Sequence, residues 1–575
     1  MMHGHEKSGP SIVAIRTNAE GIHRGKPANE DGGPSEESVE RREGAEGNAI
    51  GHGKRRTLSR ASLSHGLDRV REAARGNDQT FTALLHHIDV ELLKTAYGLL
   101  RKAASAGVDG VNWEDYGEGL ENKLKDLHDR IHRGAYRAQP SRRVYIPKPD
   151  GRERPLGIAA LEDKIVQRAL VEVLNAIWEE DFLGFSYGFR PGRGQHDALD
   201  ALAVGINRCK VNWILDADIA GFFDVVSHDW LIRFVEHRVR DRRVIRLIRK
   251  WLKAGVMEDG QVTPGKVGTP QGAVISPLLA NIYLHYVFDL WAEQWRKRQA
   301  HGDVIMVRYA DDIVVGFQHQ ADAERFLAEM RERLARFALT LHGDKTRLIR
   351  FGRFAALNRK ERGEGKPETF NFLGFTHICG RSLSGRFLLL RRTRRDRMRA
   401  RLEATGEGLR RRMHETIEEQ GDWLRRVVGG FFAYHAVPTN ADALNAFRDH
   451  VIRLWMRTLR RRSQKDGTTW QRIKVLAARW LPTPRITHPW PDERFAVKYP
   501  RWGPYAGNPH VRFCERHGGV ISRAYSNASG GRRDARAAAR DQQAGSRGQG
   551  RRCGGADGDR QAAHRSRLRR SPGHG

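Results

Sequence analysis

The stretch "VRYADDIVVG" at residues 307–316 places two adjacent carboxylates, Asp311 and Asp312, between two apolar, β-favouring runs. Like charges side by side in a strand are unfavourable unless a cation or a tight turn accounts for them. A third acid, Asp218, stands in another such run, "NWILDADIAGFF" (212–223). Brought together, these acids would form a cluster of hard oxygen ligands, which Mg²⁺ prefers. Two such ions can promote in-line phosphoryl transfer.

An Asp-Asp pair alone is weak evidence, because turns are rich in Asp and most such pairs are solvated. Asp216 also competes with Asp218, since side chains two residues apart in a strand share a face. The surrounding pattern predicts how the acids are positioned. Residues 303–317 read as two strands that meet at a tight turn, and 212–223 contains a further strand. Residues 276–295 and 321–339 have helical periodicity. This α+β arrangement would place Asp218 beside Asp311.

The net charge indicates the partner. Among 575 residues, 101 Lys and Arg outnumber 69 Asp and Glu, for a formal charge of +32. So large a net positive charge favours a polyanion as the partner, most commonly nucleic acid. The excess of positive charge could instead serve solubility alone. Four scattered cysteines form no CxxC pair and no dense disulfide framework. No apolar run approaches the roughly 20 residues that span a bilayer. We therefore expect a cytoplasmic protein with no membrane partner.

Composition divides the chain into four segments. Residues 1–61 and the Arg/Gly-rich tail 516–575 are poor in large apolar residues, so we expect both to be disordered. Between them we expect one unit over 62–385 and a second, helical unit over 386–515. In the second unit, apolar residues that recur every three or four positions predict an amphipathic helix with basic flanks. They are Leu444, Phe447, Val451, Trp455 and Leu459.

Seven blocks occur in one order: "YIPKPDGRERPLGI", "GFSYGFRPGRGQHDAL", "DADIAGFFDVVSHDWL", "GTPQGAVISPLLANIYL", "RYADDIVV", "LHGDKTRLI" and "FNFLGF". Their order and approximate spacing resemble the reverse-transcriptase blocks of group II intron-encoded proteins. Residues 429–470, followed by 480–495, resemble the maturase region, or domain X, of the same family. The resemblance covers roughly residues 62–515. It implies a right-hand polymerase fold, with fingers and a palm containing an RRM-like antiparallel sheet, followed by an α-helical thumb or domain X.

The resemblance implies that Asp218, Asp311 and Asp312 are catalytic acids that bind Mg²⁺. It favours Asp218 over Asp216, because Asp218 aligns with the family's acid. The backbone carbonyl of Ile219 is a further candidate ligand. Asp312 is the least certain direct ligand, because adjacent side chains in a hairpin tend to diverge; it could instead position the primer end or a water.

The resemblance also places Phe223 against the sugar of an incoming nucleotide, where its ring would exclude a 2′-hydroxyl. Phe222, in contrast, reads as core. Lys345, in "GDKT", resembles the basic residue beneath the primer end, although a solvated turn lysine fits nearly as well. "FNFLGF" resembles the primer-gripping block, or is simple packing.

Other residues are candidates from their own chemistry. "PDG" (149–151) predicts a hairpin turn with Lys148 and Arg154 on its two arms, where both cations could reach a triphosphate. Isolated basic residues on a surface hairpin are the alternative. Gln271 and Gly272 precede a helix; the glycine allows close backbone approach, and the amide can bond a nucleotide or template.

The predicted function is an RNA-directed DNA polymerase of a mobile group II intron. Its expected partners are intron RNA, which it would help to splice, a DNA primer or target, and dNTPs; a homodimer is left open. The alternative is a non-enzymatic splicing cofactor that retains the polymerase fold. Many relatives continue into an endonuclease with paired Cys and His ligands. After "HVRFCERHGG" this chain has no second pair, so we expect that domain to be absent.

Overall fold

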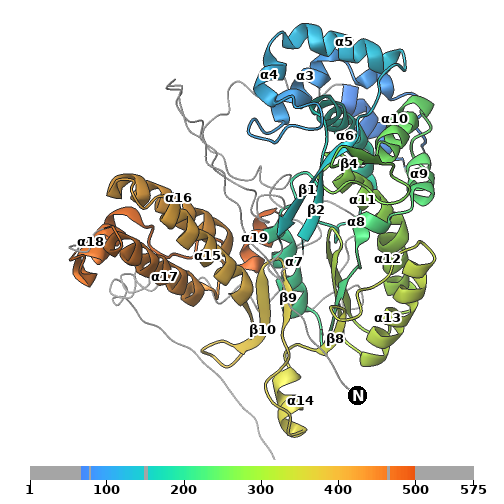
Figure 1. Ribbon diagram of the computed structural model, residues 1–575. Helices are drawn as coiled ribbons and strands as arrows, with labels where there is room; N and C mark the ends of the chain where they lie inside the picture. Colours follow the sequence, from blue (N-terminus) through green and yellow to red (C-terminus); the bar gives the residue numbers. More distant parts are fainter. Residues whose placement is uncertain (1–65, 77–78, 148–152, 463–466, 499–575) are drawn as a thin grey trace, which may run out of the picture. The chain divides into compact units, whose positions relative to one another are not determined.

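The computed structural model describes residues 66–76, 79–147, 153–462 and 467–498 (Figure 1). The predicted segments 1–61 and 516–575 and the candidate residue Lys148 lie outside these residues. Helices and mostly antiparallel strands are interspersed along the described ranges, which confirms the α+β class. No helix in these ranges is both long and apolar enough to cross a bilayer.

In the described part of the chain, four strands form the sheet that carries the acids. Its order is β6-β7-β3-β8, and every neighbouring pair is antiparallel. The strands are β3 (Trp213–Asp218), β6 (Val304–Tyr309), β7 (Asp312–Phe317) and β8 (Arg347–Arg350). The predicted hairpin over 303–317 is confirmed, and β3 pairs with it as expected.

Both faces of this sheet are covered, which explains its continuous apolar sequence. Every residue of β6 is buried, as is every residue of β7 except Asp312. Helix α7 (Gln195–Arg208) contributes to the core on one face, together with Ile214 and Val314. Helix α13 (Gln320–Ala335) contributes to the core on the other face, together with Leu215 and Val315. Polar side chains at the strand ends are therefore the ones that can reach a ligand.

The predicted helix over 276–295 is confirmed, with one difference in its middle. It consists of α11 (Ser276–Leu284), the π-helical segment η2 (His285–Asp289) and α12 (Leu290–Arg298). A π-helical turn holds one more residue than an α-helical turn, and such turns often occur at functional sites. Here the turn carries Asp289, whose side chain is completely buried.

The N-terminal part combines helices with a second sheet, of order β2-β1-β4-β5 in the described residues. Strands β1 (Ser141–Pro147) and β2 (Glu153–Ile158) form the predicted antiparallel hairpin, whose tip is not described. Helix α3 begins at Val90, where the Asp89 side chain accepts the backbone N–H of Leu92 and so caps the helix. The other elements here are η1 (Leu85–His87), α3 (Val90–Leu99), α4 (Trp113–Gly117), α5 (Leu120–His132), α6 (Leu161–Asp181), α8 (Phe222–Val225), α9 (His228–Glu236), α10 (Arg242–Lys253), β4 (Val256–Glu258) and β5 (Gln261–Thr263).

The C-terminal part begins with a three-stranded sheet, of order β11-β10-β9 in the described residues, and continues as helices. The predicted boundary at 385/386 falls in the turn between β10 and β11, and the helices begin at Arg395. The apolar face predicted from Leu444 to Leu459 is buried, as expected for an amphipathic helix. The elements are α14 (Ala355–Glu361), β9 (Phe370–Phe372), β10 (Phe375–Arg381), β11 (Phe387–Thr393), α15 (Arg395–Arg411), α16 (Ile417–His435), α17 (Ala441–Arg460), α18 (Trp470–Trp480) and α19 (Pro491–Lys498).

Candidate active site

Strand register brings the predicted acids to one edge of the sheet. Asp218, the last residue of β3, pairs directly with Asp312, the first residue of β7. Directly opposed residues in an antiparallel pair point to the same face, with Cβ atoms roughly 4.5–5.5 Å apart. Asp311 lies in the turn immediately before Asp312 and is half-buried, whereas Asp312 is exposed. The three carboxyl-bearing residues predicted from sequence therefore share one sheet edge.

The turn that carries Asp311 is tight and held from outside. Tyr309 pairs with Asp312, so only Ala310 and Asp311 connect the two strands. Ala310 has φ 56°, a left-handed value that a residue with a Cβ adopts only at a cost of about 1 kcal/mol or more. Gly188 lies against this turn so closely that a Cβ there would be 2.3 Å from the Ala310 nitrogen. Neighbouring structure thus fixes the turn.

A buried cluster of polar side chains supports the same turn from within the protein. The Arg308 guanidinium and the Asp289 carboxylate are both 0% exposed and form a two-point ion pair, with N–O distances of 2.7 and 2.5 Å. Arg308 also donates to the Asn281 amide oxygen at 3.0 Å and to the Ser186 hydroxyl at 2.7 Å. Its remaining bond, at 2.9 Å, goes to the Ala310 carbonyl oxygen, the residue immediately before Asp311.

Two cations lie beside the acids of β3. Lys345 Nζ donates to Asp218 Oδ2 at 2.8 Å, and the backbone N–H of His342 donates to the Asp218 carbonyl, so the turn before β8 docks on the end of β3. Asp216 lies one step along the same face and is 3.6 Å from Arg347. Burial raises the pKa of Asp216 to about 6, and Arg347 opposes that shift.

We tested whether these residues fit a divalent metal. The Oδ2 atom of Asp218 already binds one cation, the ammonium of Lys345. Asp218 and Asp312, which face each other across the strand pair, both carry carboxylates, the donor type that divalent metals take. Within the described residues, however, no three His, Cys, Asp or Glu side chains are grouped closely enough to form a finished metal site. The donor set therefore fits a metal in the kind of donor and in the placement of its backbone positions.

The segments predicted to contact a nucleotide are joined by backbone hydrogen bonds. Thr269 N–H donates to the Phe223 carbonyl at 2.7 Å, and Gly157 N–H donates to the Gln271 carbonyl at 2.7 Å. Gly157 lies on β2, the strand that carries Arg154. The loop before α11 therefore links the Phe223 segment to the Arg154 strand.

A family model described as reverse transcriptase (RNA-dependent DNA polymerase) matches residues 146–377. The chain is 38% identical over 281 residues to Protein YkfC of Escherichia coli (strain K12). This alignment covers 43% of this chain and 72% of YkfC. It is 37% identical over 223 residues to the group II intron-encoded protein LtrA of Lactococcus lactis. That alignment covers 38% of this chain and 37% of LtrA. The chain belongs to the reverse transcriptase/maturase family of group II introns.

Intron-encoded relatives also occur outside bacteria. The chain is 45% identical over 146 residues to an uncharacterized 91 kDa protein in the cob intron of Schizosaccharomyces pombe, across 25% of this chain and 18% of that protein. The aligned portion spans about a third of LtrA, well short of its full length. The family assignment therefore covers the fold and the reverse-transcriptase region.

The reverse-transcriptase assignment gives the predicted residues their context. Phe222 is buried against Tyr283, which confirms it as core, whereas Phe223 beside it is half-exposed. Gly272 has φ 106°, and a Cβ there would lie 2.8 Å from the Gly157 carbonyl. The backbone of Gly272 therefore lies close against β2, and its close approach to a ligand stays a prediction.

Sequence reasoning missed the buried part of this reverse-transcriptase site. Arg308 and Asp289 are charged residues inside long apolar runs, a signal that each needs a buried partner, but no spacing rule pairs them. Gln167 was also missed: its Oε1 accepts from the backbone N–H of Val274 at 3.0 Å and so fixes the loop after Gln271.

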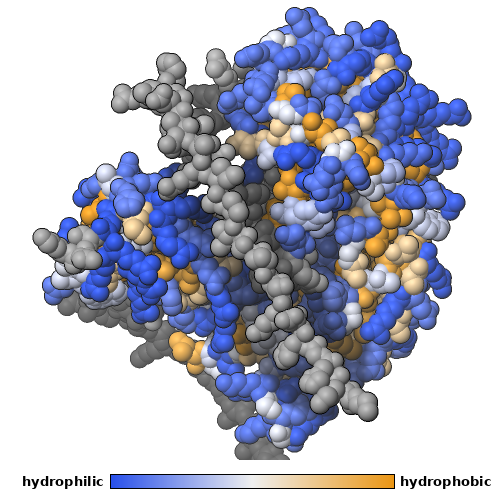
Figure 2. Space-filling view, in the orientation of Figure 1, coloured by the Kyte–Doolittle hydropathy of each residue, from blue (hydrophilic) through white to orange (hydrophobic). Residues whose placement is uncertain are grey.

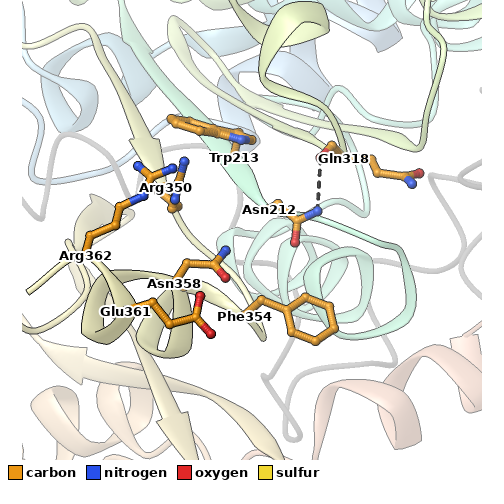
Figure 3. A pocket seen from close by; sticks show the side chains of 9 residues that line it. Asn212, Trp213, Gln318, Arg350, Phe354, Asn358, Glu361 and Arg362 are labelled. Carbon is orange, nitrogen blue, oxygen red and sulfur yellow. Dashed lines mark hydrogen bonds between the residues drawn. The ribbon is translucent and has the colours of Figure 1, made fainter. Parts of the chain in front are cut away.

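A separate cavity of about 560 Å³ lies at the opposite end of β3 from Asp218 (Figure 3). Arg350 stacks over Trp213, with its guanidinium carbon 4.9 Å from the ring centroid, and the Asn212 amide donates to the Gln318 carbonyl at 3.0 Å. Because Trp213 and Asp218 are the two ends of one strand, this cavity is not part of the acid cluster.

Proposed function

We propose that this chain is an RNA-directed DNA polymerase of a mobile group II intron, which copies intron RNA by Mg²⁺-dependent nucleotidyl transfer. We also propose that it binds that intron RNA to assist splicing and retrohoming. The observation that carries the catalytic proposal is the register pair Asp218 and Asp312, next to Asp311. A protein that only bound RNA would have no need of acids at a point where phosphates must approach, because carboxylates and phosphates are both negative and repel each other.

In this proposal Asp218, Asp311 and Asp312 hold Mg²⁺, with the Ile219 carbonyl as a further ligand. When bound, the metal supplies activation of the primer 3′-hydroxyl and charge stabilisation of the leaving pyrophosphate. When the metal takes its place at Asp218, the Lys345 ammonium moves to a phosphate of the primer end. A phosphate attracts an ammonium as a carboxylate does.

The chain's other residues hold and select the nucleotide. Arg154 pairs with the triphosphate from β2, and Gln271 bonds the nucleotide or the template. The half-exposed ring of Phe223 occupies the space that a 2′-hydroxyl would need, so deoxynucleotides are favoured. Lys148, the residue after β1 in the sequence, is a second cation for the triphosphate in this proposal.

Primer extension tests the proposal directly. The purified protein should extend a DNA primer on an RNA template with dNTPs and Mg²⁺, and Asp311→Ala should abolish extension. If the wild-type protein extends no primer but retains RNA and stimulates splicing, the non-enzymatic cofactor is correct instead. Extension that survives Asp311→Ala would remove the proposed site.

A further inference from the structure

One side of α10 and the residue before it carry a dense row of cations. The buried side of α10 packs through Val244, Leu247, Ile248 and Trp251, so the charged side faces away from that core. In Figure 1, α10 lies beside α9 at the upper right. The surface in that part of Figure 2 is largely hydrophilic. We call this surface the α10 cationic face; it consists of Arg240, Arg242, Arg243, Arg246, Arg249, Lys250 and Lys253.

Few acids neutralise the α10 cationic face. Arg249 is 3.3 Å from Glu236, and Arg243 is 3.5 Å from Asp241. Asp241 is already engaged, because its carboxylate caps α10 by accepting the backbone N–H of Arg243 and also accepts the N–H groups of Leu84 and Leu85. In the described part of the chain, no acid forms an ion pair with the remaining five cations, of which Lys250 donates to the backbone carbonyls of Gly134 and Tyr136. The face therefore keeps a strong positive potential.

The placement of these cations costs stability. Arg242 and Arg243 occupy the first turn of α10, which contains no acidic residue, although the helix dipole disfavours cations there by roughly 0.3–1 kcal/mol each. Arg242 and Arg246 are four residues apart, as are Arg246 and Lys250, and like charges at that spacing repel. Burial, and then the charges of Arg246 and Arg137, lower the pKa of Lys250. A bound polyanion would relieve the helix-dipole and like-charge costs.

The geometry of the row favours an extended ligand over a single phosphate. Arg242, Arg246, Arg249 and Lys253 follow one side of the helix for about 16 Å, at 1.5 Å per residue. Arg242, Arg246 and Arg249 also line a surface cavity of about 600 Å³, together with Arg240, Glu236 and Ile245. The aromatic residue of α10, Trp251, is buried, so this helix offers no ring for stacking on unpaired bases.

We propose that the α10 cationic face binds the phosphate backbone of an RNA helix, separately from the acids of the active site. A row of arginines without exposed rings suits a duplex, whose bases are already stacked and whose phosphates lie in rows. The choice of RNA over DNA rests on the proposed function, in which intron RNA is the chain's partner. Such a contact would position the folded intron without reading its sequence.

The test is the salt dependence of binding to an RNA hairpin with a stem of about 16 base pairs and a blocked 3′ end. The variant Arg242→Gln, Arg246→Gln, Arg249→Gln should lower the slope of log K against log salt by roughly two to three. It should weaken binding at physiological salt by about tenfold or more. The matched control, Arg298→Gln, Arg331→Gln, Arg336→Gln, removes the same charge from exposed positions on and after α12 and α13 and should leave the slope unchanged.

Three further measurements complete the test. Replacing the same three α10 arginines with Lys should restore the slope, because phosphate contact needs charge and not a guanidinium. Equal slopes for the α10 variant and its control would overturn the proposal, and equal loss on a matching DNA hairpin would overturn the choice of RNA. Primer extension on a short RNA template should stay at the wild-type rate in every variant. Absence of extension in the wild-type protein would count against the proposed polymerase and leave the hairpin result standing.

Discussion

Arg308 and Asp289 form a fully buried two-point ion pair directly beneath the turn that carries Asp311, and Arg308 also binds the Ala310 carbonyl. A buried charge pair contributes little net stability compared with apolar residues. Removing one partner, however, leaves the other charge buried without a partner. The pair is therefore better explained by what it positions. Arg308 is a positioning residue for the turn.

The variant Arg308→Lys should separate positioning from folding. Lysine keeps the charge but has no planar fork, so it cannot bind Asp289, Ser186 and Ala310 together. We expect kcat for primer extension to fall by about a hundredfold, as for a misplacement of roughly 1 Å, with little change in the KM for dNTP. The matched control is Arg238→Lys, which alters another buried pair, 2.7 Å from Asp181. It should cost stability and leave kcat unchanged; an equal loss of kcat would assign Arg308 a purely structural role.

The three acids should differ in their importance. Asp218→Asn and Asp311→Asn should each reduce extension by at least roughly a thousandfold, or about 4 kcal/mol of barrier. Asp312→Asn should cost less if Asp312 only positions the primer or a water. The register places Asp312 directly opposite Asp218, so an equal loss for Asp312→Asn would make it a full ligand. Asp216→Asn is the control, because Asp216 is paired with Arg347.

Phe223 should determine the choice of sugar. Phe223→Ala should reduce the preference for dNTPs over rNTPs by roughly 10- to 100-fold, because removing the ring opens space for a 2′-hydroxyl. The ratio of kcat/KM for the two substrates measures this effect. Phe222→Leu, which alters the buried neighbour, should change stability and leave the ratio as it was. Unchanged discrimination in Phe223→Ala would show that the ring is not the steric gate.

Lys345 should compete with the metal for Asp218. Because Lys345 Nζ donates to an oxygen that the metal would also use, Lys345→Gln should lower the Mg²⁺ concentration that gives half-maximal rate. The pair is largely exposed, so we expect a shift of no more than roughly fivefold. Arg347→Gln, which affects Asp216 instead, should shift it less. A half-maximal concentration that is unaltered by Lys345→Gln would favour the solvated turn lysine.

His377 should make the protein sensitive to acid. Burial and the charge of Arg391 lower the pKa of His377 to about 3. The unfolded chain, with an ordinary pKa near 6.5, therefore takes up a proton that the folded protein excludes. Its contribution to stability is lost as the pH falls below about 6.5, by up to about 1.4 kcal/mol per pH unit until the folded pKa is reached.

His377→Phe should reduce this loss, and a ring should fit because His377 stacks on Phe370 with centroids 4.7 Å apart. Urea midpoints at about pH 7 and about pH 5 measure the effect. His414→Gln, at an exposed position, should leave the difference between the two midpoints unchanged. A wild-type pH dependence in His377→Phe would locate the acid sensitivity elsewhere, with the half-buried His196, whose pKa burial also lowers, as the next group to test.

Local pattern was sufficient to predict the hairpin and its acids. "DVIMVRYADDIVVGF" (303–317) contains two apolar runs and a polar turn, and those features alone predict β6, the turn and β7. The partners of Arg308 could not be found in this way. Asn281 and Asp289 lie on one helix, but Ser186 and Arg308 lie on other segments, and only tertiary packing brings them together. Gly188 illustrates the same limit, because its need for a bare backbone comes from Ala310, more than 100 residues later.

The π-helical turn η2 has a consequence for insertions and deletions in this helix. An α-helix turns by about 100° per residue, so one extra residue changes the direction of every side chain that follows. Deleting one residue from 285–289 would restore a regular helix and could even make that helix more stable. It would also rotate Asp289 relative to the helix before it and away from Arg308. A length change of one residue, harmless to the helix itself, would thus leave an uncompensated positive charge beneath the turn that carries Asp311.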